Sequence, residues 1–397
     1  MQIKQLPPPV RPQFDTTRLI AIADRATGAL AELRDALLDP WPRKTAPMVT
    51  STRLAKLLKI SVERLNYLIK RGEIAAGNPK GNGRYREYSL AEAQDIVRQR
   101  GPYPRRPDNT PGQVISIGNF KGGVGKTTNA VALAQGLTLH GHKVLLIDLD
   151  PQASSTTLMG YVPDAEVNEE MTVMPLVYDE EQDLTYAIQT TYWPNLDFIP
   201  ASPSLFGADF FLPNKQSKDP EFEFWSILEK AMGKLRRDYD VIVIDTPPTL
   251  SYLAIASFMA TDGLVVPVPP ETLDYASSTQ FFRQFAELFK TMSGSREVEK
   301  RFRFIKIVLS KVKETASTTN VVRGWLQNTY PDLIASSEVL ESDVVKNASA
   351  QFKTVYDLGS YEGSVKTFTR ALETFDAVVS ELESELQFAW AELAAKE

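Results

Sequence analysis

The sequence predicts an α/β fold in which a mainly parallel sheet is flanked by helices, preceded by an N-terminal helix and a small basic unit. From about residue 108 onward, six short apolar runs rich in β-branched residues alternate with helical patterns. Such alternation is typical of a parallel sheet that is covered on both faces. Proline-rich joints also divide the chain into three segments, so we expect domains at residues 1–46, 47–107 and 108–397. The predicted strands are residues 114–117, 144–147, 196–199, 241–244, 264–268 and 304–309.

The composition of the 397 residues excludes several kinds of site. There is no cysteine, which excludes disulfides, thiolate zinc sites, iron–sulfur clusters and a cysteine nucleophile. The two histidines, His140 and His142, argue against multi-histidine metal sites and Ser–His–Asp catalysis. No apolar stretch reaches the roughly 18 residues that a membrane span needs, and the N-terminus lacks an apolar signal region. We therefore expect a cytoplasmic protein.

Charge is unevenly distributed along the chain. The net charge is −6, but residues 48–106 hold 13 lysines and arginines against 5 acidic residues. That short module therefore carries +8 and leaves −14 on the remainder. A basic module on an acidic body predicts a polyanionic partner for the module alone.

The first segment predicts one amphipathic helix. Asp15 is placed to cap it, and Pro40 and Pro42 end it. Its apolar residues recur at helical spacing and are Leu19, Ile22, Ala26, Leu30, Leu33 and Leu37. A single helix cannot bury such a stripe alone. Two alternatives remain open: the helix packs on its own chain, or it pairs with a second copy as a dimerisation helix.

The second segment has the outline of a winged helix-turn-helix. Ser51 and Ser61 are placed to cap two short helices, over residues 52–58 and 62–71, which a tight turn separates. The alternating basic run at residues 84–88 predicts a β-wing, and a third helix follows. In such a module the second helix enters the major groove of DNA. The candidate DNA-binding residues are Ser61, Arg64, Asn66, Tyr67, Lys70 and Arg71 on that helix and Arg84 and Arg86 on the wing. The alternative is an ordinary solvated charged face.

The third segment opens with a phosphate-binding motif. A glycine-rich loop follows the first predicted strand and precedes a helix, which is the context that such a loop requires. Its glycines allow successive backbone N–H groups to face a phosphate, and the helix adds its positive end. Lys126 would reach the β- and γ-phosphates, and the Thr127 hydroxyl would bind Mg²⁺. The candidate nucleotide-binding residues are Lys121, Gly122, Gly123, Val124, Gly125, Lys126, Thr127 and Thr128.

Carboxylates follow two of the other predicted strands. Asp148 and Asp150 lie at the end of the strand at residues 144–147, and Asp245 ends the strand at residues 241–244. Asp245 fits the Walker B position, where a carboxylate holds Mg²⁺ directly or through water. Taken alone, each carboxylate could equally be a helix cap or a surface charge.

The loop differs from the general phosphate-binding pattern in two ways. Phe120 stands where that pattern asks for glycine, and a second lysine, Lys121, opens the loop. Together with residues 148–152, 196–202 and 240–248, this deviant loop resembles the ParA family of plasmid and chromosome segregation ATPases. The N-terminal extension resembles specifically the long plasmid subtype. The strand at residues 264–268 followed by Pro269 resembles the segment on the adenine side of the nucleotide.

The resemblance implies a Mg²⁺-dependent ATPase that binds ATP or ADP and forms a sandwich dimer. In this family Lys121 would reach the nucleotide of the partner subunit, Asp150 would orient the attacking water, and Asp148 would support Mg²⁺ or the loop. A ParB-type partner would stimulate slow hydrolysis, the ATP form would bind nucleoid DNA without sequence preference, and the winged module would repress its own operon. Basic residues of the C-terminal part, Lys346 and Lys353 among them, are the candidates for non-specific DNA binding.

Two other functions share part of this pattern. A membrane-positioning ATPase of the septum-site type needs a basic amphipathic C-terminal helix, but residues 371–397 hold seven acidic residues against one lysine. We therefore expect that helix to pack on the sheet or on a partner, and we expect no membrane contact. A transcription regulator that uses ATP only as a signal is the second alternative. The nitrogenase iron protein also has this loop, but it requires cysteines.

Overall fold

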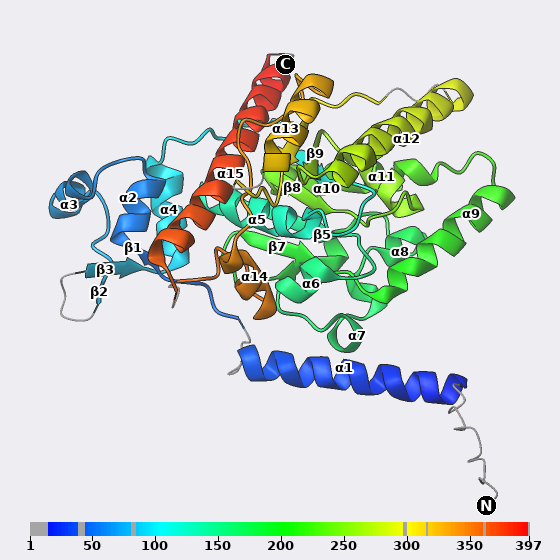
Figure 1. Ribbon diagram of the computed structural model, residues 1–397, viewed down its shortest axis with the longest axis horizontal. Helices are drawn as coiled ribbons and strands as arrows, with labels where there is room; N and C mark the ends of the chain where they lie inside the picture. Colours follow the sequence, from blue (N-terminus) through cyan, green and yellow to red (C-terminus); the bar gives the residue numbers. More distant parts are fainter. Residues whose placement is uncertain are drawn as a thin grey trace, which may run out of the picture. The chain divides into compact units, whose positions relative to one another are not determined.

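The computed structural model describes residues 15–38, 44–80, 85–296, 300–314, 317–359 and 363–395. The chain divides into two compact units, Met1–Arg43 and Lys44–Glu397. Figure 1 shows the chain coloured along its sequence, and each unit is described by itself.

The first unit contains one long helix, α1 (Thr16–Leu38). A carboxylate oxygen of Asp15 accepts the N–H of Arg18 at 2.8 Å, so the predicted cap is confirmed. Along the described side chains of α1 none is buried, and Leu19 is 57% exposed. Among the described residues of its own unit the apolar stripe is therefore not covered, and both alternatives for this helix stay open.

The second unit begins with three short helices and a small antiparallel sheet. The helices are α2 (Ser51–Leu57), α3 (Val62–Lys70) and α4 (Leu90–Arg100). The sheet has the order β1 (Val49–Thr50), β3 (Tyr85–Tyr88) and β2 (Asn78–Lys80). The two predicted helices and the strand predicted at residues 84–88 lie within one residue of their expected limits where the structure describes them, a third helix follows as expected, and β1 and β2 were not predicted.

One predicted cap in this region is wrong. The cap of α2 is Thr50, whose side chain accepts the N–H of Arg53 at 3.2 Å. The hydroxyl of Ser51 instead donates to the carbonyl of Arg86 at 3.0 Å. The reason is that Thr50 is the last residue paired with β3, so the chain turns into the helix one residue earlier than propensity suggests. Ser61 caps α3 as predicted, by accepting the N–H of Arg64 at 3.2 Å.

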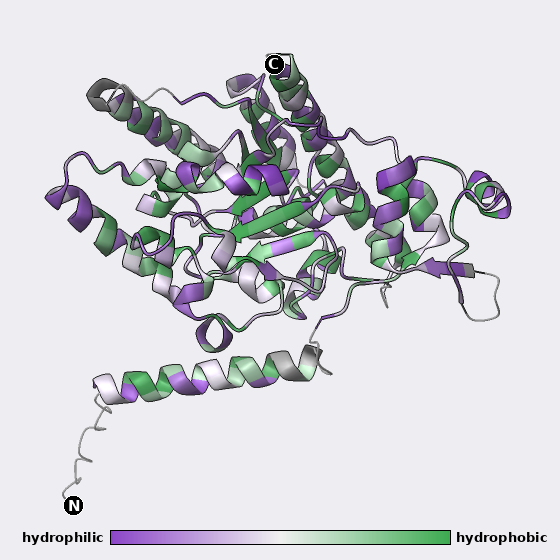
Figure 2. Ribbon diagram, turned by 180° about the vertical axis from the view of Figure 1, so that it is seen from behind, coloured by the Kyte–Doolittle hydropathy of each residue, from purple (hydrophilic) through white to green (hydrophobic). Residues whose placement is uncertain are grey.

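A seven-stranded sheet forms the centre of the second unit, in the order β10-β9-β4-β8-β5-β7-β6. All neighbouring pairs are parallel except β6 with β7. The strands are β4 (Gln113–Ile117), β5 (Val144–Asp148), β6 (Gln189–Thr190), β7 (Leu196–Ile199), β8 (Val241–Asp245), β9 (Gly263–Val268) and β10 (Phe304–Leu309). Each of the six predicted strands is therefore confirmed to within one residue at either end. Figure 2 shows the sheet as a hydrophobic layer inside the molecule.

Helices cover both faces of this sheet. Alternate residues of one strand point to opposite faces, so Ile115 packs with α5 and α15 whereas Val114 packs with α10 and α11. The longer helices are α5 (Lys126–Leu139), α9 (Ala208–Lys218), α10 (Ile227–Asp238), α11 (Tyr252–Ala260), α12 (Thr272–Arg296), α13 (Ser317–Thr329), α14 (Asp343–Ala350) and α15 (Val365–Ala394). The shorter ones are α6 (Ser154–Leu158), α7 (Pro163–Glu166), α8 (Met174–Val177), η1 (Glu169–Met171), η2 (Thr185–Ala187), η3 (Pro203–Gly207) and η4 (Phe224–Ser226).

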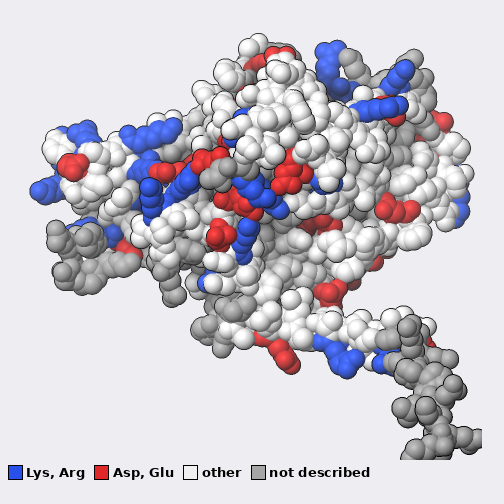
Figure 3. Space-filling model, viewed as in Figure 1, with Lys and Arg blue, Asp and Glu red and all other residues white. Residues whose placement is uncertain are grey.

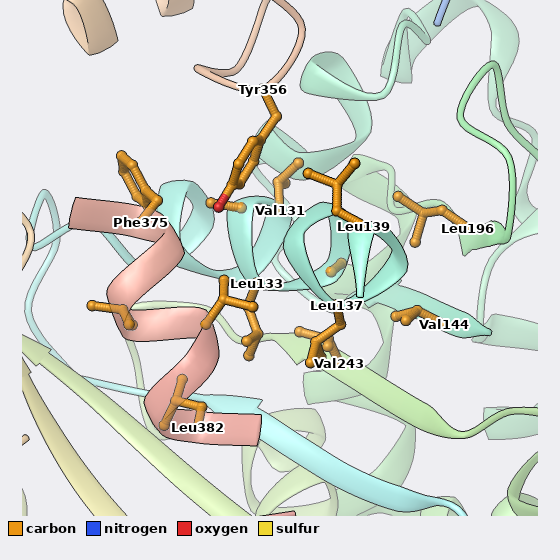
Figure 4. Packing of buried hydrophobic residues seen from close by; sticks show 14 of the residues in the cluster. Val131, Leu133, Leu137, Leu139, Val144, Leu196, Val243, Tyr356, Phe375 and Leu382 are labelled. Carbon is orange, nitrogen blue, oxygen red and sulfur yellow. The ribbon is translucent and has the colours of Figure 1, made fainter. Parts of the chain in front are cut away.

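The C-terminal helix α15 was expected on the sheet or on a partner, and it packs against α5, which covers one face of the sheet. Figure 4 shows Phe375 and Leu382 of α15 facing Leu133 of α5. The two helices approach closely at Gly136, where an added Cβ would lie 2.5 Å from a methyl group of Val379. Among the described residues, no helix has the length and apolar character that crossing a bilayer requires.

A half-buried ion pair joins the small helical unit to α15. Arg53 of α2 donates to both carboxylate oxygens of Asp376, at 2.5 and 2.8 Å, and the Tyr356 hydroxyl donates to the same carboxylate at 3.0 Å. Burial acts to raise the pKa of Asp376, but the bonds from Arg53 outweigh it and lower that pKa. Tyr103, in the segment before β4, stacks on His140 at 3.7 Å between ring centroids. The module is thus fixed to the helix pair that covers one face of the sheet.

Candidate nucleotide-binding site

The glycine-rich loop lies between β4 and α5, at the carboxyl end of a central strand. Gly123 has φ +75° and Gly125 has φ +96°. Residues other than glycine rarely adopt this left-handed backbone conformation, so the two glycines allow the loop to turn tightly before the helix. In an open parallel sheet, the carboxyl ends of the strands are where ligands bind.

Lys126 crosses this loop from its C-terminal end. Its ammonium group donates to the carbonyl of Lys121 at 3.0 Å and is buried. Burial lowers the pKa of Lys126, while the charges of Asp245 and Asp150 oppose that shift. A buried lysine cation at this point is available to phosphate oxygens, which would replace the carbonyl as its partner.

Two asparagines hold the two ends of the loop. Asn119 accepts the N–H of Lys121 at 3.0 Å and donates to the carbonyl of Pro267 at 2.9 Å, which ties the loop to β9. The side chain of Asn129 donates to the carbonyl of Gly125 at 2.8 Å. The sequence analysis did not identify either asparagine, although both lie within a few residues of the motif.

Asp245 is fully buried at the end of β8. One carboxylate oxygen accepts the hydroxyl of Ser155 at 2.8 Å, whereas the other has no hydrogen-bond partner among the described residues. Burial raises the pKa of Asp245 to about 6, while the nearby hydroxyl groups of Ser155 and Thr127 act against that shift. A buried, unpartnered carboxylate oxygen beside a threonine hydroxyl fits the oxygen ligands that Mg²⁺ prefers.

Asp148 has both oxygens occupied by protein donors. One accepts the N–H and the hydroxyl of Thr156, at 2.9 and 2.8 Å, and the other accepts the N–H of Asp150 at 3.1 Å. Burial, followed by the charge of Asp245, raises the pKa of Asp148. These contacts hold the segment that follows β5, residues 150–156, so both roles predicted for Asp148 stay predictions.

Asp150 follows β5 and so lies at the same edge of the sheet as the loop, close enough for its charge to act to raise the pKa of Lys126. One of its oxygens accepts the N–H of Gln152 at 2.9 Å. Burial raises the pKa of Asp150, while that N–H and the charge of Lys126 oppose the shift. The structure therefore brings Asp150, Asp245 and Lys126 together around one point.

Lys121 pairs within its own chain. Its ammonium group lies 2.8 Å from a carboxylate oxygen of Asp274, which is 6% exposed and belongs to the first turn of α12. The sequence pattern did not point to Asp274, because an isolated carboxylate far along the chain carries no signal. The predicted reach of Lys121 to a partner's nucleotide would require this pair to open.

Pro269 is buried just beyond β9, and its carbonyl accepts the N–H of Glu271 at 2.8 Å. It lies at the same edge of the sheet as the loop, since β9 is hydrogen-bonded to β4. Its predicted contact with adenine stays a prediction.

The candidate DNA-binding residues of α3 form one exposed surface with stacked aromatic and basic groups. The guanidinium groups of Arg64 and Arg71 lie 5.0 and 5.6 Å from the ring centre of Tyr67. Arg71 also pairs with Glu73 at 2.8 Å. Ser61, Asn66 and Lys70 are exposed around them. Figure 3 shows basic side chains gathered over this end of the second unit.

The other predicted DNA contacts are less available. Arg86 folds back and donates to the carbonyls of Ala76 and Gly77, at 3.0 and 3.3 Å, while Arg84 lies outside the described residues. The ammonium group of Lys346 lies 2.7 Å from a carboxylate oxygen of Glu341. Lys353 is half-buried after α14. Their roles in DNA binding stay predictions.

The chain resembles known proteins over most of its length. A family profile described as an AAA domain matches residues 112–298. "Putative replication protein A" of Rhizobium rhizogenes is 31% identical over 291 residues, which cover 72% of each chain. "Protein SopA" of Escherichia coli K12 is 29% identical over 365 residues, covering 89% of this chain and 92% of that protein.

The fold is also known from solved structures. One described as "Partition Protein" superposes with a TM-score of 0.63 at 23% identity, covering 94% of this chain and 99% of that one. This similarity extends beyond the central sheet to the preceding helical segment. By its sequence similarity to curated relatives and its P-loop fold, the chain belongs to the ParA family of partition ATPases.

Proposed function

We propose that this chain is a DNA partition ATPase that binds ATP and Mg²⁺ at residues 121–128, dimerises, and hydrolyses ATP slowly until a ParB-type partner stimulates it. The observation that carries the proposal is the grouping of Lys126, Asp150 and the half-satisfied carboxylate of Asp245 at the mouth of the loop. A cation for the phosphates, a carboxylate oxygen for Mg²⁺ and an acceptor for the attacking water are the groups that ATP hydrolysis needs, and an ordinary structural loop needs none of them.

Thr127 and Asp245 would hold Mg²⁺ in this proposal. The bound metal would supply positive charge that neutralises the phosphate oxygens. Lys126 neutralises further charge on the phosphates, and the loop amides orient them. Asp150 orients the water that attacks the γ-phosphate, since it follows β5 at the same edge of the sheet as the loop and its charge acts on Lys126.

Dimerisation would complete the site. Lys121 leaves Asp274 and reaches the nucleotide of the second subunit, so that ATP is bound between two copies. Moving the ammonium group of Lys121 away from Asp274 costs little free energy only if its new partner is also anionic. A phosphate group of ATP meets this requirement, whereas an empty partner site does not.

DNA would be bound at two places in this proposal. The exposed surface of α3 binds operator DNA of the protein's own operon, with the basic and aromatic residues around Tyr67 contacting bases and phosphates. The ATP-bound dimer binds nucleoid DNA without sequence preference, through basic residues of the C-terminal part, Lys346 and Lys353 among them. The nucleotide would thus decide which DNA is bound, because it shifts the population between two conformations that differ in their affinity for operator and nucleoid DNA.

The proposal is tested by measuring ATP turnover of the full chain alone, with DNA, and with DNA plus a ParB-type centromere-binding protein. We expect slow basal turnover that rises severalfold only with both additions, and none in Lys126→Ala. Turnover that does not respond to the partner would favour a nucleotide-sensing transcription regulator instead.

The DNA surface has its own test. Arg64→Ala combined with Lys70→Ala should weaken operator binding in a footprint assay and leave basal ATP turnover unchanged. The matched control is Lys218→Ala combined with Lys230→Ala, which removes two positive charges from α9 and α10. Equal loss of operator binding in both pairs would assign the effect to net charge rather than to α3.

A further inference from the structure

Two side chains just beyond β10 hold the phosphate-binding loop from its outer side. The hydroxyl of Ser310 donates to the carbonyl of Val124 at 2.7 Å, and the ammonium group of Lys311 donates to the carbonyl of Gly123 at 2.6 Å. Ser310 is 1% exposed, so water does not compete for the first of these bonds. Two consecutive carbonyls of the loop are therefore held by residues from a distant part of the chain.

Holding these carbonyls also orients the amides behind them. A peptide group is planar and trans, so the C=O of one residue and the N–H of the next point in opposite directions. With the carbonyls of Gly123 and Val124 turned toward the end of β10, the N–H groups of Val124 and Gly125 must point away from it. These are two of the amides that a phosphate-binding loop offers to its ligand.

The backbone around Lys311 is itself held in place for this contact. Lys311 has φ +53°, in the left-handed region that lysine seldom occupies. The preceding residue is anchored to the sheet, since the N–H of Ser310 donates to the carbonyl of Val268 at 3.1 Å. Backbone conformations of this kind persist where the surrounding structure determines them, and they concentrate at functional sites.

We propose that Lys311 and Ser310 are positioning residues that set the loop in its phosphate-binding conformation before ATP arrives. This inference rests on the proposed function, because it assigns the loop to ATP. Without the two bonds, the peptide groups of Gly123 and Val124 turn more freely, and only part of the population presents its amides correctly. The apparent affinity for ATP then falls by that fraction.

The effect should appear in KM and not in kcat. The amides contact the phosphates in the bound substrate and in the transition state alike, so their preorganisation changes binding and leaves the chemical step as it is. A hydrogen bond to a charged group corresponds to about a tenfold to hundredfold change in affinity. Because the Lys311 side chain is exposed and water competes for its bond, the lower end of this range applies: Lys311→Met should raise the Kd and KM for ATP by about tenfold, with kcat within about twofold of wild type.

The experiment compares four variants of the full chain by equilibrium binding of ATP and by steady-state turnover. Lys311→Met removes the ammonium group, and Lys311→Arg, which keeps a donor, should restore most of the affinity. Ser310→Ala removes the hydroxyl group that donates to the carbonyl of Val124, and it should also weaken ATP binding. Lys313→Met is the matched control, since Lys313 is 49% exposed and pairs with Glu271 rather than with the loop.

Three results would overturn the inference about Lys311 and Ser310. Wild-type affinity in Lys311→Met overturns the inference, as does equal weakening in Lys311→Met and Lys313→Met, which would mean a general charge effect. A fall in kcat at unchanged KM also overturns it, because it would place Lys311 in the chemical step. Should Lys311→Met fail to fold by circular dichroism, Ser310→Ala carries the same comparison. A wild-type chain that binds no ATP defeats the proposed function itself, and the inference falls with it.

Discussion

Replacing Asp245 by asparagine should make the ATP-free protein more stable while removing its Mg²⁺-dependent activity. Asp245 is fully buried, and one of its oxygens lacks a hydrogen-bond partner among the described residues. A buried carboxylate that is only half satisfied costs free energy unless a cation is bound to it. Such a group is kept for function at the expense of stability.

The size of the effect follows from the pKa of Asp245. Burial raises that pKa from 3.8 to about 6, a difference of about two units. Each unit corresponds to about 1.4 kcal/mol, so ionisation at this site destabilises the folded state by roughly 2–3 kcal/mol at pH 7, a penalty that Asp245 shares with the neighbouring buried Asp148. Unpaired amide hydrogens of the new asparagine would take back roughly 1 kcal/mol. We therefore expect Asp245→Asn to raise the free energy of unfolding by about 2 kcal/mol at pH 7.

The sign of the pH dependence gives a second check. Because the folded pKa lies above the unfolded one, the penalty is complete above pH 6 and disappears as the pH falls toward 3.8. The gain in Asp245→Asn should therefore shrink over that interval. Urea unfolding without nucleotide, followed by tryptophan fluorescence, measures it, with the exposed Asp332→Asn as a control that should change little. A destabilised Asp245→Asn, or one that hydrolyses ATP at the wild-type rate with Mg²⁺, would refute the reasoning.

Three further predictions concern other carboxylates. Asp150→Ala should keep ATP binding and lose hydrolysis, because only the water-orienting acceptor is removed; wild-type turnover would assign that role elsewhere. Asp376→Ala should lower the free energy of unfolding by about 2 kcal/mol, since it leaves the half-buried Arg53 guanidinium without its carboxylate, and a loss below about 1 kcal/mol in urea would contradict this. Burial acts to raise the pKa of Glu383, but hydrogen bonds from His140 and His142 outweigh it and lower that pKa to about 2. The stability advantage of wild type over Glu383→Gln should therefore hold above pH 4.5 and shrink as the pH falls toward 2; an advantage independent of pH would contradict this.

The central sheet could be predicted because its strands are buried on both faces. Runs such as those of β8 and β10 contain almost only apolar residues, so a polar residue on either side of the run shows where the strand begins and ends. The edge strand β6 was missed because Gln189–Thr190 is short and polar. The cap of α2 was placed one residue late because pairing of Thr50 in a sheet decided where the helix begins. Tertiary contacts here overrode a local preference.

The site could be predicted only where its residues form a local motif. Lys126, Thr127 and the aspartates follow strands in a fixed order, and the fold brings them to one edge of the sheet. Asp274 and Lys311 were not assigned to the loop, because each is an ordinary residue whose role depends on a contact across more than 150 positions. The sequence contains no periodicity or spacing that records such a contact.

The central claim is that residues 121–128 bind the phosphates of ATP with Mg²⁺. Equilibrium dialysis of labelled ATP against the full chain, with and without Mg²⁺, tests it most directly when wild type is compared with Lys126→Ala. We predict saturable binding of one ATP per chain that strengthens with Mg²⁺, and a loss of about a hundredfold or more in Lys126→Ala, where a buried charge–phosphate contact is removed. Equal affinities in the two proteins, or the absence of saturable binding in wild type, would contradict the claim.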